Sequence, residues 1–158
     1  MRKEPIISRE AKSSERTNNF DEVVLGYSKD EAFKEAARCL QCKDPTCIAG
    51  CPVNIDIKKF IFQVTQNDLA GAYFTIRETN NFPSICGRVC PAEYQCRKAC
   101  VLNKKAALYA SKESINIHFL ERFVGDYGIK GRLDVPLAKD KKRSQFKIAV
   151  IGSGPAGL

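Results

Sequence analysis

The chain has 158 residues, which is enough for one domain of ordinary size, a connector and the start of a second domain. Its formal net charge is +8, and most of the excess follows Cys100, where 11 basic residues face 5 acidic ones. Its longest apolar stretches, such as residues 57–64, contain lysines and fall well short of the about 20 apolar residues that span a bilayer. The N-terminus lacks the apolar core of a secretory signal. These features argue against a membrane protein and predict a cytoplasmic one.

The N-terminal part begins with a polar segment and continues into the first expected helix. Residues 1–27 are polar and balanced in charge, which predicts an extended or mobile arm. Ser28 and Glu31 form an S-x-x-E capping box, and apolar residues recur behind it at helical spacing as far as Leu40. This helix would bring the first pair of cysteines to its C-terminal end.

Two further helices are expected before the middle of the chain. Asp56 can cap a helix over residues 57–64, and Asp68 can cap another over residues 69–76. The sequence Asn-Asn-Phe-Pro at residues 80–83 then ends the second of them.

The second half of the chain predicts shorter helices, one longer helix and a strand. Cysteines spaced four residues apart would share one face of a short helix, and these pairs are Cys86 with Cys90 and Cys96 with Cys100. A last helix is expected over residues 115–124, ended by Gly125 and Gly128. A β-rich run at residues 146–151 leads straight into the glycine-rich sequence 152–157. Because the chain stops there, we expect a truncated piece of a longer protein.

The eight cysteines indicate the chemistry of the chain. A disulfide scaffold needs an oxidising compartment, whereas clustered thiols in a reducing cytosol more often bind metal. Both groups of cysteines contain a Cys-Pro pair, which is typical of iron–sulfur proteins. The groups read Cys39-x2-Cys42-x4-Cys47-x3-Cys51-Pro52 and Cys86-x3-Cys90-Pro91-x4-Cys96-x3-Cys100.

The spacing predicts two clusters whose ligands interlock. In two-cluster ferredoxins the cysteine before proline ligates the other cluster, because it points away from the first three. Applied here, each group gives one ligand to the site of the other group. The predicted ligands are Cys39, Cys42, Cys47 and Cys100 for the first cluster, and Cys51, Cys90 and Cys96 for the second.

The residues alone leave the eighth ligand open. Eight cysteines divide evenly into two sites of four thiolates, and this count favours Cys86 as the eighth ligand. Glu121 is the other candidate, since it lies at the edge of the apolar face of the last expected helix, where a solvated glutamate is the plain alternative. His118 and Arg122 point the other way on that helix, and for His118, the only histidine, we expect a surface or capped role and not ligation.

A zinc-stabilised binding module is the alternative from another class of protein. Zinc ribbons usually present two C-x2-C knuckles, however, and only one C-x2-C occurs here. The basic run at residues 139–143 could bind an acidic protein or nucleic acid, but it is more simply a solvated linker. Nucleic-acid sites also combine a clustered basic face with stacking aromatics, so we expect no nucleic-acid partner.

Four motifs resemble one family of iron–sulfur domains. They are Arg38-Cys39-Leu40-Gln41-Cys42, Gly50-Cys51-Pro52-Val53-Asn54, Thr79-Asn80-Asn81-Phe82-Pro83 and Gly87-Arg88-Val89-Cys90-Pro91. They are similar to the N-terminal iron–sulfur domain of NADPH-dependent glutamate synthase small subunits. This domain also occurs in the large subunit of NADH-dependent reduced ferredoxin:NADP oxidoreductase and in dihydropyrimidine dehydrogenase.

The resemblance implies an all-α domain with two [4Fe-4S] clusters, followed by the first strand and glycine-rich loop of a truncated FAD-binding Rossmann-type domain. The expected boundaries are an arm at 1–27, the iron–sulfur domain at 28–128, a basic linker at 129–145 and the start of the FAD/NAD(P)-binding domain at 146–158. Glycines in such a loop let the backbone approach a pyrophosphate. Here they would be Gly152, Gly154 and Gly157.

The resemblance also implies a function and an eighth ligand. It implies an electron-transfer module of a flavin-dependent NAD(P)H oxidoreductase, with FAD and NADPH in the full-length protein and a large catalytic subunit as partner. A glutamate synthase (NADPH) small subunit is the leading expectation, and the large subunit of a bifurcating ferredoxin:NADP oxidoreductase is the alternative. The family implies Glu121, and not Cys86, as the eighth ligand. The chain alone would not be catalytically complete.

Overall fold

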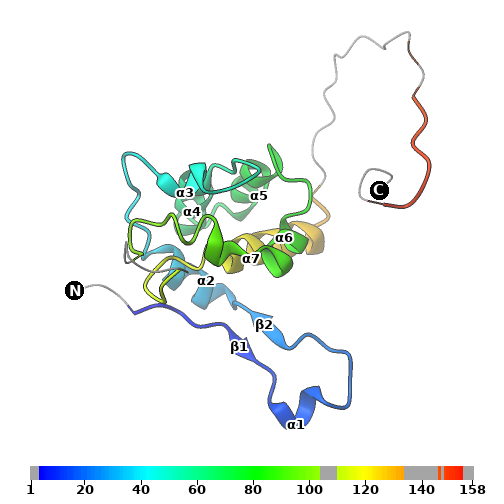
Figure 1. Ribbon diagram of the computed structural model, residues 1–158, viewed down its shortest axis with the longest axis horizontal. Helices are drawn as coiled ribbons and strands as arrows, with labels where there is room; N and C mark the ends of the chain where they lie inside the picture. The colour runs from blue at the N-terminus through cyan, green and yellow to red at the C-terminus, as the bar shows by residue number, and fades with distance from the viewer. Residues whose placement is uncertain (1–3, 104–109, 134–145, 147, 155–158) are drawn as a thin grey trace.

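The computed structural model describes residues 4–103, 110–133, 146 and 148–154. These residues form a small body of packed helices with a two-stranded sheet beside it (Figure 1). The helices are α1 (Ser13–Arg16), α2 (Lys29–Ala36), α3 (Thr46–Ala49), α4 (Ile57–Thr65), α5 (Leu69–Arg77), α6 (Pro83–Val89) and α7 (Ile117–Lys130), with a 3-10 turn, η1, at Ala92–Tyr94. None of the described helices is long and apolar enough to cross a membrane.

The three expected helix starts are confirmed by their caps. Ser28 and Glu31 form both bonds of the capping box, since the Glu31 N–H donates to Ser28 Oγ at 3.3 Å and the Ser28 N–H donates to Glu31 Oε2 at 2.7 Å. Asp56 accepts the N–H of the third residue after it at 3.0 Å, and Asp68 does the same at 2.9 Å. Each cap satisfies a backbone donor that the first helical turn leaves unpaired.

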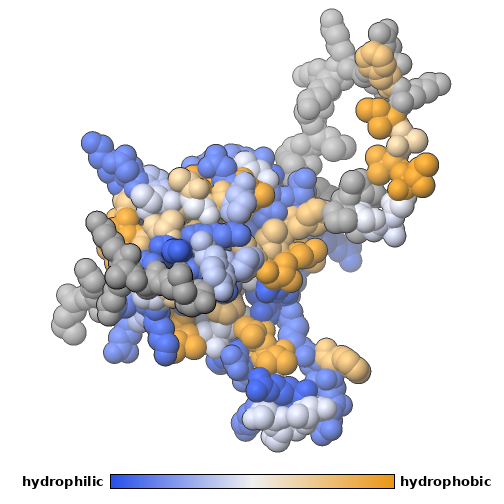
Figure 2. Space-filling model, viewed as in Figure 1, coloured by the Kyte–Doolittle hydropathy of each residue, from blue (hydrophilic) through white to orange (hydrophobic). Residues whose placement is uncertain are grey.

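The core lies between α2, α4, α5 and α7. Side chains spaced at helical intervals are almost completely buried there, and they include Phe60, Ile61, Val64, Ile76 and Leu120. Burying each such side chain contributes roughly 1.5–3 kcal/mol. The outer faces are largely polar, although apolar side chains appear over α6 (Figure 2), where Ile85 and Val89 are more than half exposed.

The last helix is longer than the sequence predicts. We expected Gly125 and Gly128 to end it, but both lie inside α7, which is followed by its C-cap residue Gly131. A Cβ at Gly125 would come within 2.5 Å of the Ser84 nitrogen, and one at Gly128 within 2.2 Å of Tyr73 Cε2. These two glycines therefore allow α7 to pack closely against α6 and α5, and they do not terminate it.

The N-terminal segment is part of the described fold and includes two strands that the sequence did not predict. Strand β1 (Arg9–Glu10) pairs antiparallel with β2 (Val24–Gly26). The Tyr27 hydroxyl donates to the Ile6 carbonyl at 2.5 Å, and the Ile6 N–H donates to Glu35 Oε2 at 2.9 Å. Strands this short carry no alternating pattern that a sequence could reveal.

The second cysteine group lies on less helix than its spacing suggested. Cys86 is in α6 and Cys90 caps its C-terminus, but residues 95–99, which include Cys96 and end just before Cys100, form turns instead of a helix. Gln95, with φ −117° and ψ −115°, departs from helical geometry at the end of η1. Turns, and not a helix, therefore connect Cys96 to Cys100.

The expected strand at 146–151 is not formed in the described residues of that segment. Residues 146 and 148–151 carry no strand, and Phe146, Ile148, Val150 and Ile151 are all at least 60% exposed. A strand is stabilised by hydrogen bonds to a neighbouring strand, and neither described strand pairs with residues 146 and 148–151. Gly152 has φ +111°, and no heavy atom lies within 4 Å of where a Cβ would stand on Gly154. Gly157 lies outside the described residues.

Candidate metal centres

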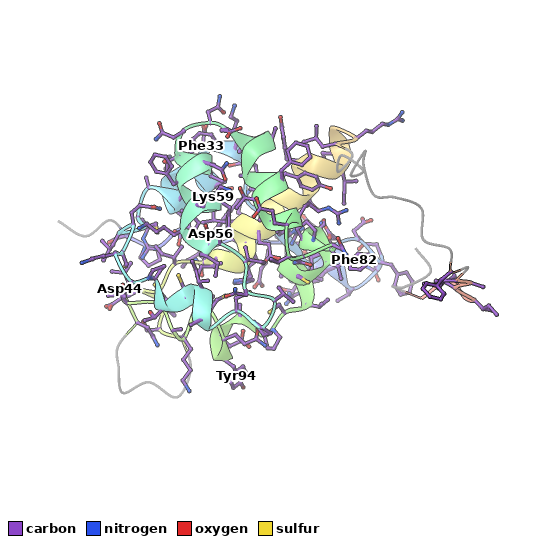
Figure 3. The ribbon with its side chains drawn as sticks, turned by 90° about the horizontal axis from the view of Figure 1, so that it is seen from above. Phe33, Asp44, Asp56, Lys59, Phe82 and Tyr94 are labelled. Carbon is purple, nitrogen blue, oxygen red and sulfur yellow. The ribbon has the colours of Figure 1, made fainter. Side chains whose placement is uncertain are left out.

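One cavity is lined by four cysteines that come from two distant parts of the chain, residues 39–47 and Cys100. They are Cys39, Cys42, Cys47 and Cys100. Its inner wall is apolar and is made by Ile57 and Ile61 of α4 together with Ile115 and Ile117. We call this set of four cysteines the first thiol group. Figure 3 labels Asp44, between Cys42 and Cys47, at the left of the view and Tyr94, in η1, at its bottom.

The four thiols of the first group lie close enough to influence one another. Burial, with smaller effects from the charges of Cys100, Cys39 and Cys42, raises the pKa of the Cys47 thiol to about 12. Burial likewise raises the pKa of Cys39, with added effects from Cys100 and Cys42. Gln41, with φ +51°, turns the chain between the first two cysteines. Residues remote in sequence therefore face one another here.

Two contacts between the cysteine-bearing loops bring the two halves together. Thr46 Oγ1 donates to the Ala99 carbonyl at 2.5 Å. A Cβ at Gly50 would lie only 2.7 Å from the Ala99 Cβ, so glycine allows this approach. Gly50 directly precedes Cys51, and Ala99 directly precedes Cys100. The contact therefore keeps near each other the two cysteines that are each predicted to ligate the cluster of the other sequence motif.

A second group contains three thiols and a carboxylate. Burial, with smaller effects from the charges of Cys51, Cys90 and Glu121, raises the pKa of Cys96 to about 12. Burial raises the pKa of Cys90 to about 11, with added effects from Glu121, Cys86 and Cys51. We call Cys51, Cys90, Cys96 and Glu121 the second group. The structure thus brings together the residues that the sequence assigned to each site.

Glu121 is buried, and the alternative of a solvated boundary glutamate is wrong. Its residue is 6% exposed, and burial raises the pKa of its carboxyl to about 7. Asn80 Nδ2 donates to Glu121 Oε1 at 2.7 Å. Within the described residues no ion pair forms on this carboxylate. A buried carboxylate without a cation is costly, so Glu121 is a candidate functional residue and not part of the solvated surface.

Cys86 lies next to the second group. It is half-buried on α6, and burial raises the pKa of its thiol, with smaller effects from the charges of Glu121 and Cys51. Its Sγ donates to Asn80 Oδ1 at 3.6 Å. Both candidates for the eighth ligand are therefore present in the same neighbourhood.

The outward direction predicted for Arg122 is wrong. Arg122 is 4% exposed, and its guanidinium donates to the Val24 carbonyl at 2.7 Å and to Glu22 Oε2 at 2.8 Å. His118 is half-buried, and burial lowers its pKa to about 4. The helical wheel was misleading because β2 and the segment before it cover this side of α7.

Sequence reasoning overlooked Asn80, which it treated only as a helix breaker. The structure buries it at the end of α5, where its side chain bonds both Glu121 and Cys86. The one sequence signal for a functional role of Asn80 was its place in the Thr-Asn-Asn-Phe-Pro motif. An asparagine in such a motif, however, is typical of a turn.

The donor set fits iron–sulfur clusters. All eight cysteines are free thiols, and thiolates are the usual ligands of such clusters. Within the described part of the chain, no three His, Cys, Asp or Glu side chains are arranged to hold a single metal ion. The fold and these two groups define a small helical iron–sulfur domain.

Comparison with known families gives the same class. The family model described as dihydropyrimidine dehydrogenase domain II, 4Fe-4S cluster, matches residues 16–132. The chain belongs to this family, and the resemblance seen in the cysteine motifs is confirmed.

Relatives of the chain are subunits or domains of oxidoreductases. It is 37% identical over 141 residues to the NAD-dependent dihydropyrimidine dehydrogenase subunit PreT of Salmonella typhimurium, covering 89% of this chain and 32% of the relative. It is 32% identical over 146 residues to the glutamate synthase [NADPH] small chain of Azospirillum brasilense, covering 92% and 29%. It is 36% identical over 145 residues to the glutamate synthase [NADH] of Saccharomyces cerevisiae, covering 90% and 6%. The chain spans about a third or less of the length of these curated relatives.

Proposed function

We propose that the chain is an electron-transfer module with two interlocked [4Fe-4S] clusters. The observation that carries the proposal is the convergence of thiols from distant loops into two groups, with one cysteine of each sequence motif in the group of the other. The first cluster would be held by Cys39, Cys42, Cys47 and Cys100, and the second by Cys51, Cys90, Cys96 and Glu121. Each cluster supplies a centre that gains and loses one electron.

The chain's own residues give the two sites different surroundings. Ile57, Ile61, Ile115 and Ile117 keep water from the inner side of the first thiol group. The second group has a carboxylate in place of a thiol and a buried amide beside it. Ligand type, hydrogen bonds and exposure all set cluster potential, so the two sites should differ in potential.

The larger enzyme would be a flavin-dependent NAD(P)H oxidoreductase. We favour a glutamate synthase small subunit that passes electrons from FAD to a large partner subunit, as the motifs first suggested. The start of an FAD-binding domain at residue 146, with Gly152, Gly154 and Gly157 at the pyrophosphate, belongs to this proposal, as do NADPH as donor and the domain boundaries given above. The bifurcating ferredoxin:NADP oxidoreductase would use the same parts.

A dihydropyrimidine dehydrogenase subunit is the second candidate. It is favoured by the 37% identity to the subunit PreT, against 32% for the glutamate synthase small chain. Purification of the full-length protein with its native partner separates the two. A large chain that makes glutamate from glutamine supports the first candidate, and one that reduces pyrimidines supports the second.

Metal analysis with redox titration tests the module itself. Anaerobically purified chain should hold about eight irons and as many sulfides, as two four-iron clusters require. Reductive titration followed by electron paramagnetic resonance should show two distinct one-electron steps. Zinc without visible absorbance would contradict the proposal and favour a zinc-stabilised binding module, and iron that cannot be reduced would leave the clusters a structural role only.

A further inference from the structure

Asn80 lies between the two side chains that could serve as the eighth ligand. Its Nδ2 donates to Glu121 Oε1 at 2.7 Å, and its Oδ1 accepts from Cys86 Sγ at 3.6 Å. Asn80 is 5% exposed, so bulk water has little access to either hydrogen bond. One amide group therefore contacts both candidates, with its donor toward the carboxylate and its acceptor toward the thiol.

The orientation of this amide is fixed by the backbone. The Phe82 N–H donates to Asn80 Oδ1 at 2.9 Å, which requires the oxygen to lie on that side and the NH₂ group on the other. The Asn80 N–H itself donates to the Ile76 carbonyl at 2.9 Å and continues the end of α5. The amide therefore cannot turn to offer its oxygen to Glu121 without losing the bond from Phe82.

The two bonds hold the two side chains in different ways. The Asn80 NH₂ group orients the buried Glu121 carboxylate through its Oε1. The Cys86 thiol donates its one proton to Asn80 Oδ1, the oxygen that the Phe82 N–H also holds in place. The same residue thus orients Glu121 and ties Cys86 to the end of α5.

We propose that Asn80 selects Glu121 over Cys86 as the eighth ligand, and that Cys86 is a reserve thiol that replaces Glu121 when this selection is lost. The inference rests on the proposed function, because it presupposes the second cluster. The exchange breaks one iron–oxygen bond and forms one iron–sulfur bond. Cys86 releases its thiol proton to solvent, Glu121 becomes a free carboxylate, and no electron is gained or lost.

The substitution Asn80→Asp removes the donor and keeps the turn. One carboxylate oxygen can still accept from the Phe82 N–H, while the other replaces Nδ2 and faces Glu121 Oε1. Two anionic oxygens at such a distance repel strongly. Asn81→Asp is the matched control, since Asn81 is exposed and gains the same charge one residue further along.

Iron content and the spectrum of the second cluster provide the readouts. Asn80→Asp should keep about eight irons per chain, as two four-iron clusters require, but shift the resonance spectrum and midpoint potential of one cluster only. Asn80→Asp combined with Cys86→Ser should fall to about four irons. Asn81→Asp and Cys86→Ser alone should match the wild type in both readouts.

Glu121→Ala tests the reserve thiol without touching Asn80. It should keep about eight irons with a shifted spectrum, whereas Glu121→Ala with Cys86→Ser should keep about four. The proposal is overturned if Glu121→Ala or Asn80→Asp loses about four irons while Cys86 is present, or if the Asn80→Asp spectrum equals that of the wild type. Wild-type chain that binds zinc and no iron would instead overturn the proposed function itself.

Discussion

Gly87 of α6 lies directly against the backbone of Arg122 in α7, where a Cβ at position 87 would come within 2.6 Å of the Arg122 nitrogen. Gly125 of α7 makes the reciprocal approach to Ser84. With a glycine on each helix, α6 and α7 meet at backbone distance. Glu121 directly precedes Arg122, so this contact also holds α7 where Glu121 reaches the second group.

Gly87→Ala should separate the two helices. The added methyl has no space against the α7 backbone, and overpacking of this kind costs typically about 1–3 kcal/mol. We expect lower unfolding free energy and partial loss of the second cluster, with the first retained. Urea unfolding and iron analysis measure both effects. Gly154→Ala is the control, because no heavy atom lies within 4 Å of its Cβ position. If Gly87→Ala and Gly154→Ala had equal iron content and equal stability, α6 and α7 would have space for the added methyl group, and the close backbone contact would be contradicted.

Glu35 should be one of the most sensitive positions for stability. Its residue is 0% exposed, and it accepts from the Ile6 N–H and the Asn116 N–H, each at 2.9 Å, and pairs with Arg38 at 2.5 Å. Glu35→Ala removes the acceptor of all three bonds, and breaking a buried ion pair costs roughly 3–5 kcal/mol.

Chemical denaturation checks this effect. Asp30→Ala, at an exposed position of the same helix, should change stability by less than about 0.5 kcal/mol. Protease cleavage within residues 4–27 should also become faster in Glu35→Ala, because Ile6 loses its partner. A loss no larger than that of Asp30→Ala would contradict this role of Glu35.

His118 should make stability depend on pH in a mildly acidic window. Burial lowers its pKa to about 4 from the ordinary 6.5, and Arg97 adds a smaller effect. Between these values the unfolded chain binds a proton that the folded chain does not, so the unfolding free energy falls as pH falls. The loss is at most about 1.4 kcal/mol per pH unit.

His118→Phe should flatten this dependence. Urea unfolding of both proteins at pH 7 and pH 5.5 gives the comparison, and other titrating groups cancel in the difference. The wild type should lose more stability than the variant over this interval. Identical losses would mean that His118 is hydrated and titrates normally in the folded chain.

The sequence predicted the elements whose signals are local. The caps at Ser28, Asp56 and Asp68 each depend on a side chain and a backbone N–H three residues later, so the sequence was sufficient. The division of the cysteines between two clusters was predicted from spacing, because the cysteine before Pro52 is expected to point away from the three cysteines that precede it.

Three of the errors arise from contacts between distant segments. Gly125 and Gly128 look like helix stops until α6 and α5 are known to pack on them. Arg122 looks solvated until Val24 is seen to cover it. Asn80 looks like a turn residue until the partners of its amide are visible. None of these relationships leaves a periodic pattern in the sequence.

Iron analysis of two double variants tests the interlocked arrangement most directly. Cys39→Ser with Cys100→Ser removes two ligands of the first cluster and should leave about four irons per chain, whereas Cys39→Ser with Cys51→Ser removes one ligand from each cluster and should leave almost none. Both variants lose two thiols, so each is a control for the other. If the clusters were instead formed each within its own sequence motif, the two results would be reversed, and that outcome would contradict the interlocked pair.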